Sequence, residues 1–210
     1  MKKYSEIRNS LKTGDVVAFS GSGPMSTLIK AGTLSHISHM GIVTKEAISS
    51  PMGQTLFLYE ATSLAKSPDF IRSKVIKGAQ MQLLSKRLAF EEGRAYVYPL
   101  KNKLSQENCL NMTYWLRTMA VQGVPYDYIQ AVASGLGIVG DVIVGNEPDF
   151  SRLFCFELVA GALQIAKEFD KGFNPSSANA KDIFERVKFY PCYEVETSIE
   201  QFAQLDFAVA

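Results

Sequence analysis

The stretch SHISHMGIVT (residues 35–44) holds both histidines of the chain and predicts a central strand of the fold. Its second half is apolar and β-branched, which is typical of a buried strand. Side chains alternate between the two faces of a strand, so His39 shares its face with Gly41 and Val43. On a continuous strand His36 projects to the opposite face. Any Cys–His or Ser–His chemistry in this chain must use one of these two imidazoles.

A metal site is not expected at this strand. Histidines on opposite faces of one strand make a poor pair of ligands, and a zinc site needs more than two. The sequence holds no CxxC or HExxH motif that would complete such a set. We therefore expect neither a metal nor a cofactor.

The segments on either side of residues 35–44 predict strands first and helices later along the chain. Strands are expected near 15–19, 38–44, 54–62, 79–84, 94–100 and 187–190, with a turn at 50–53. Helices are expected near 4–12, 24–31, 105–121 (with Ser105 as N-cap), 153–169 and 180–186. This grouping favours an α+β fold with an antiparallel sheet packed against helices. At 210 residues, the chain (1–210) is expected to form a single domain with a sizeable core.

Composition and charge narrow the class of protein. A hydrophobic fraction of 47%, with 13 Phe and 9 Tyr, excludes a disordered chain. The formal net charge of +1 argues against a dedicated nucleic-acid binder. Three cysteines cannot all pair with one another, and free thiols fit a reducing compartment.

The sequence also predicts a cytoplasmic protein without stable membrane insertion. Residues 1–9 carry two lysines but no apolar stretch, so no signal peptide is expected. The most apolar run, residues 129–145, is interrupted by polar residues and glycines and is too short for a spanning helix.

Cys155 is the cysteine best placed for chemistry. It falls in the first turn of the predicted helix 153–169, where the positive end of the helix dipole favours a thiolate. It also belongs to the apolar stripe of that helix, so a buried packing role is the alternative. Cys109 lies on an apolar helix face and Cys192 follows Pro191, and neither position favours a nucleophile.

Glu60 is the acid best placed to assist a histidine. It ends the apolar run 56–59, and a carboxylate at the end of a buried strand needs a partner or water. If its strand neighbours that of His39, it can accept the second imidazole N–H and fix the tautomer. A solvated carboxylate at a strand end is the alternative.

A glycine-rich motif, GLGIVG (135–140), matches the pattern GxGxxG. A dinucleotide site needs this motif directly after a strand and at the start of a helix, inside a βαβ unit. No such unit precedes it here, so we interpret the segment as an apolar loop.

Five short motifs stand in one order along the chain: LKTGDVV (11–17), SHMGIV (38–43), YEA (59–61), GVPYD (123–127) and FCFELV (154–159). Together they resemble the circularly permuted NlpC/P60 group, which are bacterial papain-like proteins of the YebB/YiiX type. In ordinary papain-like hydrolases the cysteine precedes the histidine, whereas the permuted group shows the reverse order, as this chain does. The resemblance implies a permuted papain-like fold.

The resemblance also implies roles for individual residues. Cys155 is implied as the nucleophile, His39 as the base and Glu60 as the third, orienting member of a triad. Tyr126 matches a family tyrosine near the active site and is implied to hold substrate or an oxyanion. Phe156 stands where the family usually has a small residue, and it is expected to line and narrow the substrate pocket.

These observations predict a cysteine amidase or peptidase that hydrolyses small amide or peptide substrates bearing amino acids, such as cell-wall fragments. A close alternative is an acyltransferase or thioesterase on lipid-like acyl groups, for which residues 129–145 are compatible with an acyl-binding lid. A non-catalytic binding protein of the same fold is a third hypothesis. The complete set of Cys155, His39 and Glu60 argues against that third hypothesis.

Overall fold

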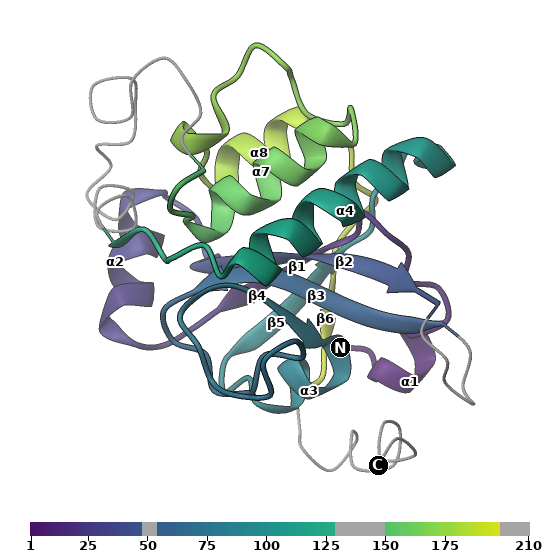
Figure 1. The fold of residues 1–210 in the computed structure, drawn as a ribbon. Coiled ribbons are helices and arrows are strands. Elements are labelled where there is room, and N and C mark those ends of the chain that lie inside the picture. The colour runs from purple at the N-terminus through teal and green to yellow at the C-terminus, as the bar shows by residue number, and fades with distance from the viewer. Residues whose placement is uncertain (48–53, 129–149, 198–210) are drawn as a thin grey trace.

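The fold is built on a six-stranded antiparallel sheet, seen in a computed structural model that describes residues 1–47, 54–128 and 150–197 (Figure 1). The strand order is β4-β3-β2-β1-β5-β6, and every pair of neighbours is antiparallel. The strands are β1 (Val16–Ser20), β2 (His39–Glu46), β3 (Thr55–Thr62), β4 (Gly78–Leu83), β5 (Arg94–Tyr98) and β6 (Tyr193–Val195). The predicted α+β class with an antiparallel sheet is confirmed.

Helices cover both faces of this sheet. They are α1 (Tyr4–Ile7), α2 (Pro24–Gly32), α3 (Leu84–Ala89), α4 (Gln106–Gln122), α7 (Cys155–Ile165) and α8 (Ala180–Arg186), with a 3-10 turn η1 (Pro175–Ser177). In Figure 1, α4, α7 and α8 lie over one face, whereas α1 and α3 lie on the other and α2 flanks one end. Each face has its own apolar core, because side chains alternate along β3: Phe57 and Tyr59 pack towards α4 and α7, and Leu56 and Leu58 towards α1 and α3.

The central elements agree closely with the sequence predictions. α4 begins at its predicted cap, because the Ser105 hydroxyl accepts a hydrogen bond from the Asn108 amide at 3.1 Å. It ends at Gly123, which has the left-handed φ of 65° that favours glycine.

Other expectations about the elements are wrong. The strand predicted at 187–190 is replaced by one isolated bridge between Phe189 and Leu100, and the last strand is β6 instead. The first helix ends at Ile7 rather than near residue 12, and α7 stops at Ile165. Helix α3 was not expected. The turn at 50–53, the motif at 135–140 and the run at 129–145 lie outside the described residues.

The candidate residues meet at one end of the sheet. His39 begins β2 and is directly paired with Phe19, near the end of β1. Glu60 lies near the end of β3, which is the neighbour of β2 on the other side. Antiparallel pairing therefore brings the start of β2 and the ends of β1 and β3 to the same end of the sheet. None of the described helices is both long enough and apolar enough to cross a bilayer.

Candidate active site

Helix α7 places Cys155 at this end of the sheet. Cys155 is the first residue of the helix, after Phe154 in extended conformation. The Glu157 carboxylate accepts a hydrogen bond from the Phe154 amide at 3.3 Å, which closes the helix start. The first amides of a helix have no partner inside the helix, so they are donors for a negative oxygen beside Cys155. The Cys155 side chain is fully buried.

His39 joins Cys155 to Glu60. The imidazole Nε2 lies 2.6 Å from a carboxylate oxygen of Glu60, which is itself fully buried. The Cys155 thiol also hydrogen-bonds to this imidazole, and because Nε2 is taken by Glu60, Nδ1 is the nitrogen left for the sulfur. The imidazole is stacked on the ring of Phe19, with 5.6 Å between ring centres. The structure thus brings the three predicted triad residues into one hydrogen-bonded chain.

The pKa values of His39 and Glu60 are shifted in opposite directions. Burial alone would lower the pKa of His39, but the hydrogen bonds and charges of Cys155 and Glu60 outweigh it and raise this pKa to about 9. Burial alone would raise the pKa of Glu60, but the charges and hydrogen bonds of Arg87 and His39 lower it to about 2. At neutral pH the imidazole therefore carries a proton and the carboxylate does not.

The other histidine is not part of this arrangement. His36 lies before β2, is exposed, and contacts Tyr96 edge-to-face with 5.3 Å between ring centres. The cluster with Cys155 therefore contains His39, the histidine that the resemblance implies, and does not contain His36.

Arg87 is a charged member of the cluster that the sequence predictions missed. Its Nε donates to both oxygens of Glu60, at 3.0 and 3.1 Å, and its Nη1 donates to Glu91 at 2.9 Å. Its guanidinium carbon lies 4.1 Å from the centre of the Phe19 ring. In the sequence, Arg87 is marked only by its place between the apolar residues Leu84 and Leu88, and helix α3, which holds all three, was not predicted.

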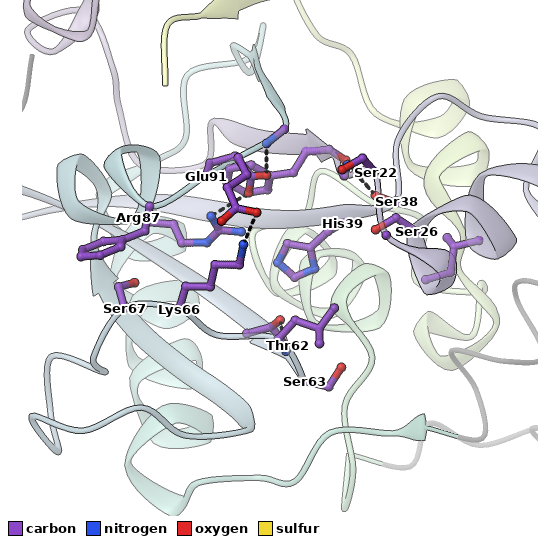
Figure 2. Close-up of a pocket in the computed structure, with 18 of the residues that line it drawn as sticks. Ser22, Ser26, Ser38, His39, Thr62, Ser63, Lys66, Ser67, Arg87 and Glu91 are labelled. Carbon is purple, nitrogen blue, oxygen red and sulfur yellow. Dashed lines mark hydrogen bonds and ion pairs between the residues drawn. The ribbon is translucent and has the colours of Figure 1, made fainter. Parts of the chain in front are cut away.

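A pocket of about 270 Å³ opens beside His39. Figure 2 shows His39 pointing into it, with Ser22, Ser26 and Ser38 on one side and Arg87 on the other. Its wall comes from the loop after β1, helix α2, the start of β2, the end of β3 with the segment after it, helix α3 with the segment that follows it, and Tyr126. The His39 side chain is 16% exposed to this space. Cys155 is fully buried and does not belong to the pocket wall, whereas His39 does.

Tyr126 lines the pocket and is close enough to Cys155 to feel its charge. The segment that holds Tyr126 runs beside Leu153, which stands two residues before helix α7. The Leu153 amide donates to the carbonyl of Pro125 at 2.9 Å, and the Leu153 carbonyl accepts from the Asp127 amide at 3.1 Å. Burial and the nearby charge of Cys155 raise the pKa of the Tyr126 hydroxyl, so this group stays protonated and is able to donate a hydrogen bond.

Gly78 fixes this tyrosine segment to the sheet. The Ala79 amide donates to the carbonyl of Val124 at 2.8 Å. Gly78 has a φ of 111°, and the same carbonyl occupies the place where a Cβ at this position would stand. Only glycine allows this close approach.

Phe156 does not lie where it was expected. It is fully buried in the core, 5.0 Å from Phe154 between ring centres and roughly perpendicular to it, and it does not belong to the pocket wall. The physical reason is helix geometry: the next residue after Cys155 points about 100° away around the helix. Phe156 therefore supports the helix rather than contacting the pocket.

Cys192 is exposed, and burial raises the pKa of the Cys109 thiol, so neither shares the setting of Cys155.

A solved structure has a similar fold. It is described as the crystal structure of metalloprotein yiiX from Escherichia coli O157:H7, DUF1105. The two chains are 17% identical, with a TM-score of 0.50 over 92% of this chain and 93% of that chain. This likeness concerns the fold, and at that level it agrees with the YiiX-type resemblance of the motifs. No protein-family model and no curated protein matches the chain.

The description of yiiX as a metalloprotein raises the question of a metal at this site. The donor set of Cys155, His39 and Glu60 does not fit one, because the carboxylate oxygens of Glu60 face Arg87 and the imidazole Nε2 faces Glu60. Across residues 1–47, 54–128 and 150–197, no three His, Cys, Asp or Glu side chains are arranged to hold a metal ion.

Proposed function

We propose that this protein is a cysteine hydrolase of the amidase or peptidase type, acting on small amides that bear amino acids. One observation carries the proposal: a cysteine at a helix start hydrogen-bonds to a protonated histidine, which is held by an ionised, fully buried glutamate. A structural ion pair does not need a thiol as its third member. A thiolate nucleophile that is activated by a histidine, which a carboxylate in turn orients, uses all three groups in this order.

The proposed reaction uses each of these three groups. The Cys155 thiolate attacks the substrate carbonyl carbon, and the electron pair of the C=O bond moves to the oxygen, which the first amides of α7 stabilise. The His39 imidazolium gives its proton to the leaving amine as the C–N bond breaks. Neutral His39 then takes a proton from water, and the hydroxide attacks the thioester. The carboxylic acid leaves and the thiolate is restored.

The order of the residues supports a permuted papain-like arrangement of the NlpC/P60 kind. His39 precedes Cys155 in the chain, yet the two meet at a helix start against an antiparallel sheet. The five motifs and the similar fold of yiiX point the same way.

The pocket wall favours a polar substrate over a fatty acyl chain. Serine and threonine side chains are the commonest members of the wall: Ser22, Ser26, Ser38, Thr62, Ser63 and Ser67. The hydroxyls of Ser38, Thr62 and Ser67 already hydrogen-bond to Gly21, Leu64 and Gln82. A peptide or another polar amide offers donors and acceptors to the hydroxyls of Ser22, Ser26 and Ser63, which an alkyl chain does not.

A substrate panel tests the proposal. Fluorogenic aminoacyl amides and dipeptide amides are compared with acyl esters and acyl thioesters, for the wild type, Cys155→Ala and the matched control Cys192→Ser. We expect amide turnover that Cys155→Ala abolishes and Cys192→Ser retains.

Two other outcomes of this panel have distinct meanings. Turnover of esters alone would favour the acyltransferase or thioesterase hypothesis, and binding without any turnover would favour a binding protein.

The panel is repeated after dialysis against EDTA, where we expect unchanged rates. Loss of turnover that zinc restores would contradict the thiolate mechanism.

A further inference from the structure

We infer that Arg87 is a positioning residue of the candidate active site: it keeps Glu60 ionised and aimed at His39, and thereby preserves the thiolate–imidazolium pair in acidic solution. This inference rests on the proposed function, because it concerns the same site. It adds a fourth member, supplied by helix α3, that acts through Glu60 and does not touch Cys155.

The geometry of Glu60 shows what holds it. Arg87 contacts both carboxylate oxygens through Nε, and His39 contacts one of them through Nε2. The strand partner of Glu60 on β4 is Gln80, whose buried amide hydrogen-bonds to no group in the described part of the chain. The orientation of the carboxylate therefore depends on the two cationic side chains.

Arg87 is itself fixed on several sides. Glu91, one helical turn further on, accepts from its Nη1, and the ring of Phe19 lies beneath its guanidinium carbon. The side chain is only 14% exposed. An arginine held in this way presents its charge to Glu60 without the mobility of a surface side chain.

The charges in contact explain why Arg87 is needed. A fully buried carboxylate tends to take up a proton, because burial disfavours its charge. His39 alone would have to offset this cost while its own charge is also shared with Cys155. Arg87 adds a permanent positive charge, and Glu91 balances part of it at the far end of the guanidinium.

Loss of the Arg87 charge is expected to weaken the thiolate–imidazolium pair. The carboxylate of Glu60 would be protonated at higher pH, and a neutral Glu60 stabilises imidazolium less well. The missing positive charge would also disfavour the thiolate directly. Both effects break the thiolate–imidazolium pair at higher pH than in the wild type.

Two readouts that need no substrate test this inference. The first is the thiolate absorbance near 240 nm against pH, taken as the difference between each protein and the same protein carrying Cys155→Ser. The second is the NMR titration of the His39 ring, whose acid inflection reports protonation of Glu60. The chain has two histidines, so a His36→Asn variant assigns the signals.

The variants are Arg87→Met, which removes the charge, and Arg87→Lys, which keeps the charge but loses the planar fork. Arg72→Met is the matched control, because Arg72 pairs with the buried Asp69 at 3.3 Å, apart from the triad. In Arg87→Met we expect both acid midpoints to rise by about one pH unit or more, with a smaller rise in Arg87→Lys. Arg72→Met is expected to leave them unchanged.

The outcomes separate this inference from the proposed function. Unchanged midpoints in a folded Arg87→Met protein would overturn the positioning role. If Arg87→Met fails to fold, Arg87→Gln removes the charge instead, and unchanged midpoints in that variant for both the thiolate and the His39 ring would overturn the role. A wild type without thiolate absorbance at neutral pH would contradict the proposed function, and the His39 ring titration would still decide the role of Arg87.

Discussion

The Glu60→Gln substitution gives a quantitative test of the charge arrangement. Glu60 is fully buried, and its pKa is lowered from an ordinary 4.5 to about 2 by Arg87 and His39. At about 1.4 kcal/mol for each tenfold change in the ionisation equilibrium, this lowering corresponds to about 3 kcal/mol of folding stability at neutral pH. A glutamine of the same shape cannot supply this contribution.

The sign of the pH dependence follows from the direction of the pKa. A carboxyl group whose pKa is lowered by folding stabilises the protein above its unfolded pKa, and this stability is lost as the pH falls towards the folded value. The free energy of unfolding of the wild type should therefore exceed that of Glu60→Gln by about 3 kcal/mol at pH 6. The difference should shrink to roughly half of this at pH 3.

Urea denaturation at several pH values, followed by circular dichroism, measures this difference. The control is Glu185→Gln, which alters an exposed carboxylate 3.8 Å from Lys181 and should change stability by less than about 1 kcal/mol at any pH. A Glu60→Gln difference that stays constant from pH 6 to pH 3 would refute the assignment of an ionised, paired Glu60.

The remaining predictions concern the choice of histidine, a glycine and a helix cap. His39→Ala should lower amide turnover by about 10³-fold or more, whereas His36→Ala should retain most of it; equal losses in two folded proteins would contradict the assignment. Gly78→Ala should cost about 2–4 kcal/mol in urea denaturation, because the new methyl group meets the carbonyl of Val124 at a positive φ. Ser105→Ala should cost about 1 kcal/mol in the same assay, and no measurable loss would mean that the cap hydrogen bond is dispensable.

The sheet was predictable because its signals are local. Residues 38–44 and 54–62 are apolar and β-branched, and both became strands within a residue or two of the expected bounds. Period-2 alternation then placed Gly41 and Val43 on the face of His39, away from Ile42. Cys155 was predictable for a similar reason, because the apolar stripe that begins beside it marks a helix start.

Other parts of the site depend on contacts between distant segments, which local patterns do not carry. Helix α3 has only six residues, too few for a clear helical period, and its contribution, Arg87, meets Glu60 from another element. Phe156 was placed in the pocket from its neighbour in sequence, but the turn of the helix directs it into the core. The last strand was missed because Tyr193–Val195 has only three residues and is recognisable as a strand only through its pairing with β5.

The burial of the Cys155 sulfur also affects how resistant the site is to oxidation. A thiolate is the form of cysteine that hydrogen peroxide attacks, and each oxidation beyond the first step is irreversible for most proteins. The sulfur of Cys155 has no exposed surface, so peroxide meets the exposed Cys192 first. The packing that buries the thiol of Cys155 therefore slows its oxidation, and the exposed Cys192 is the thiol on which such damage should accumulate first.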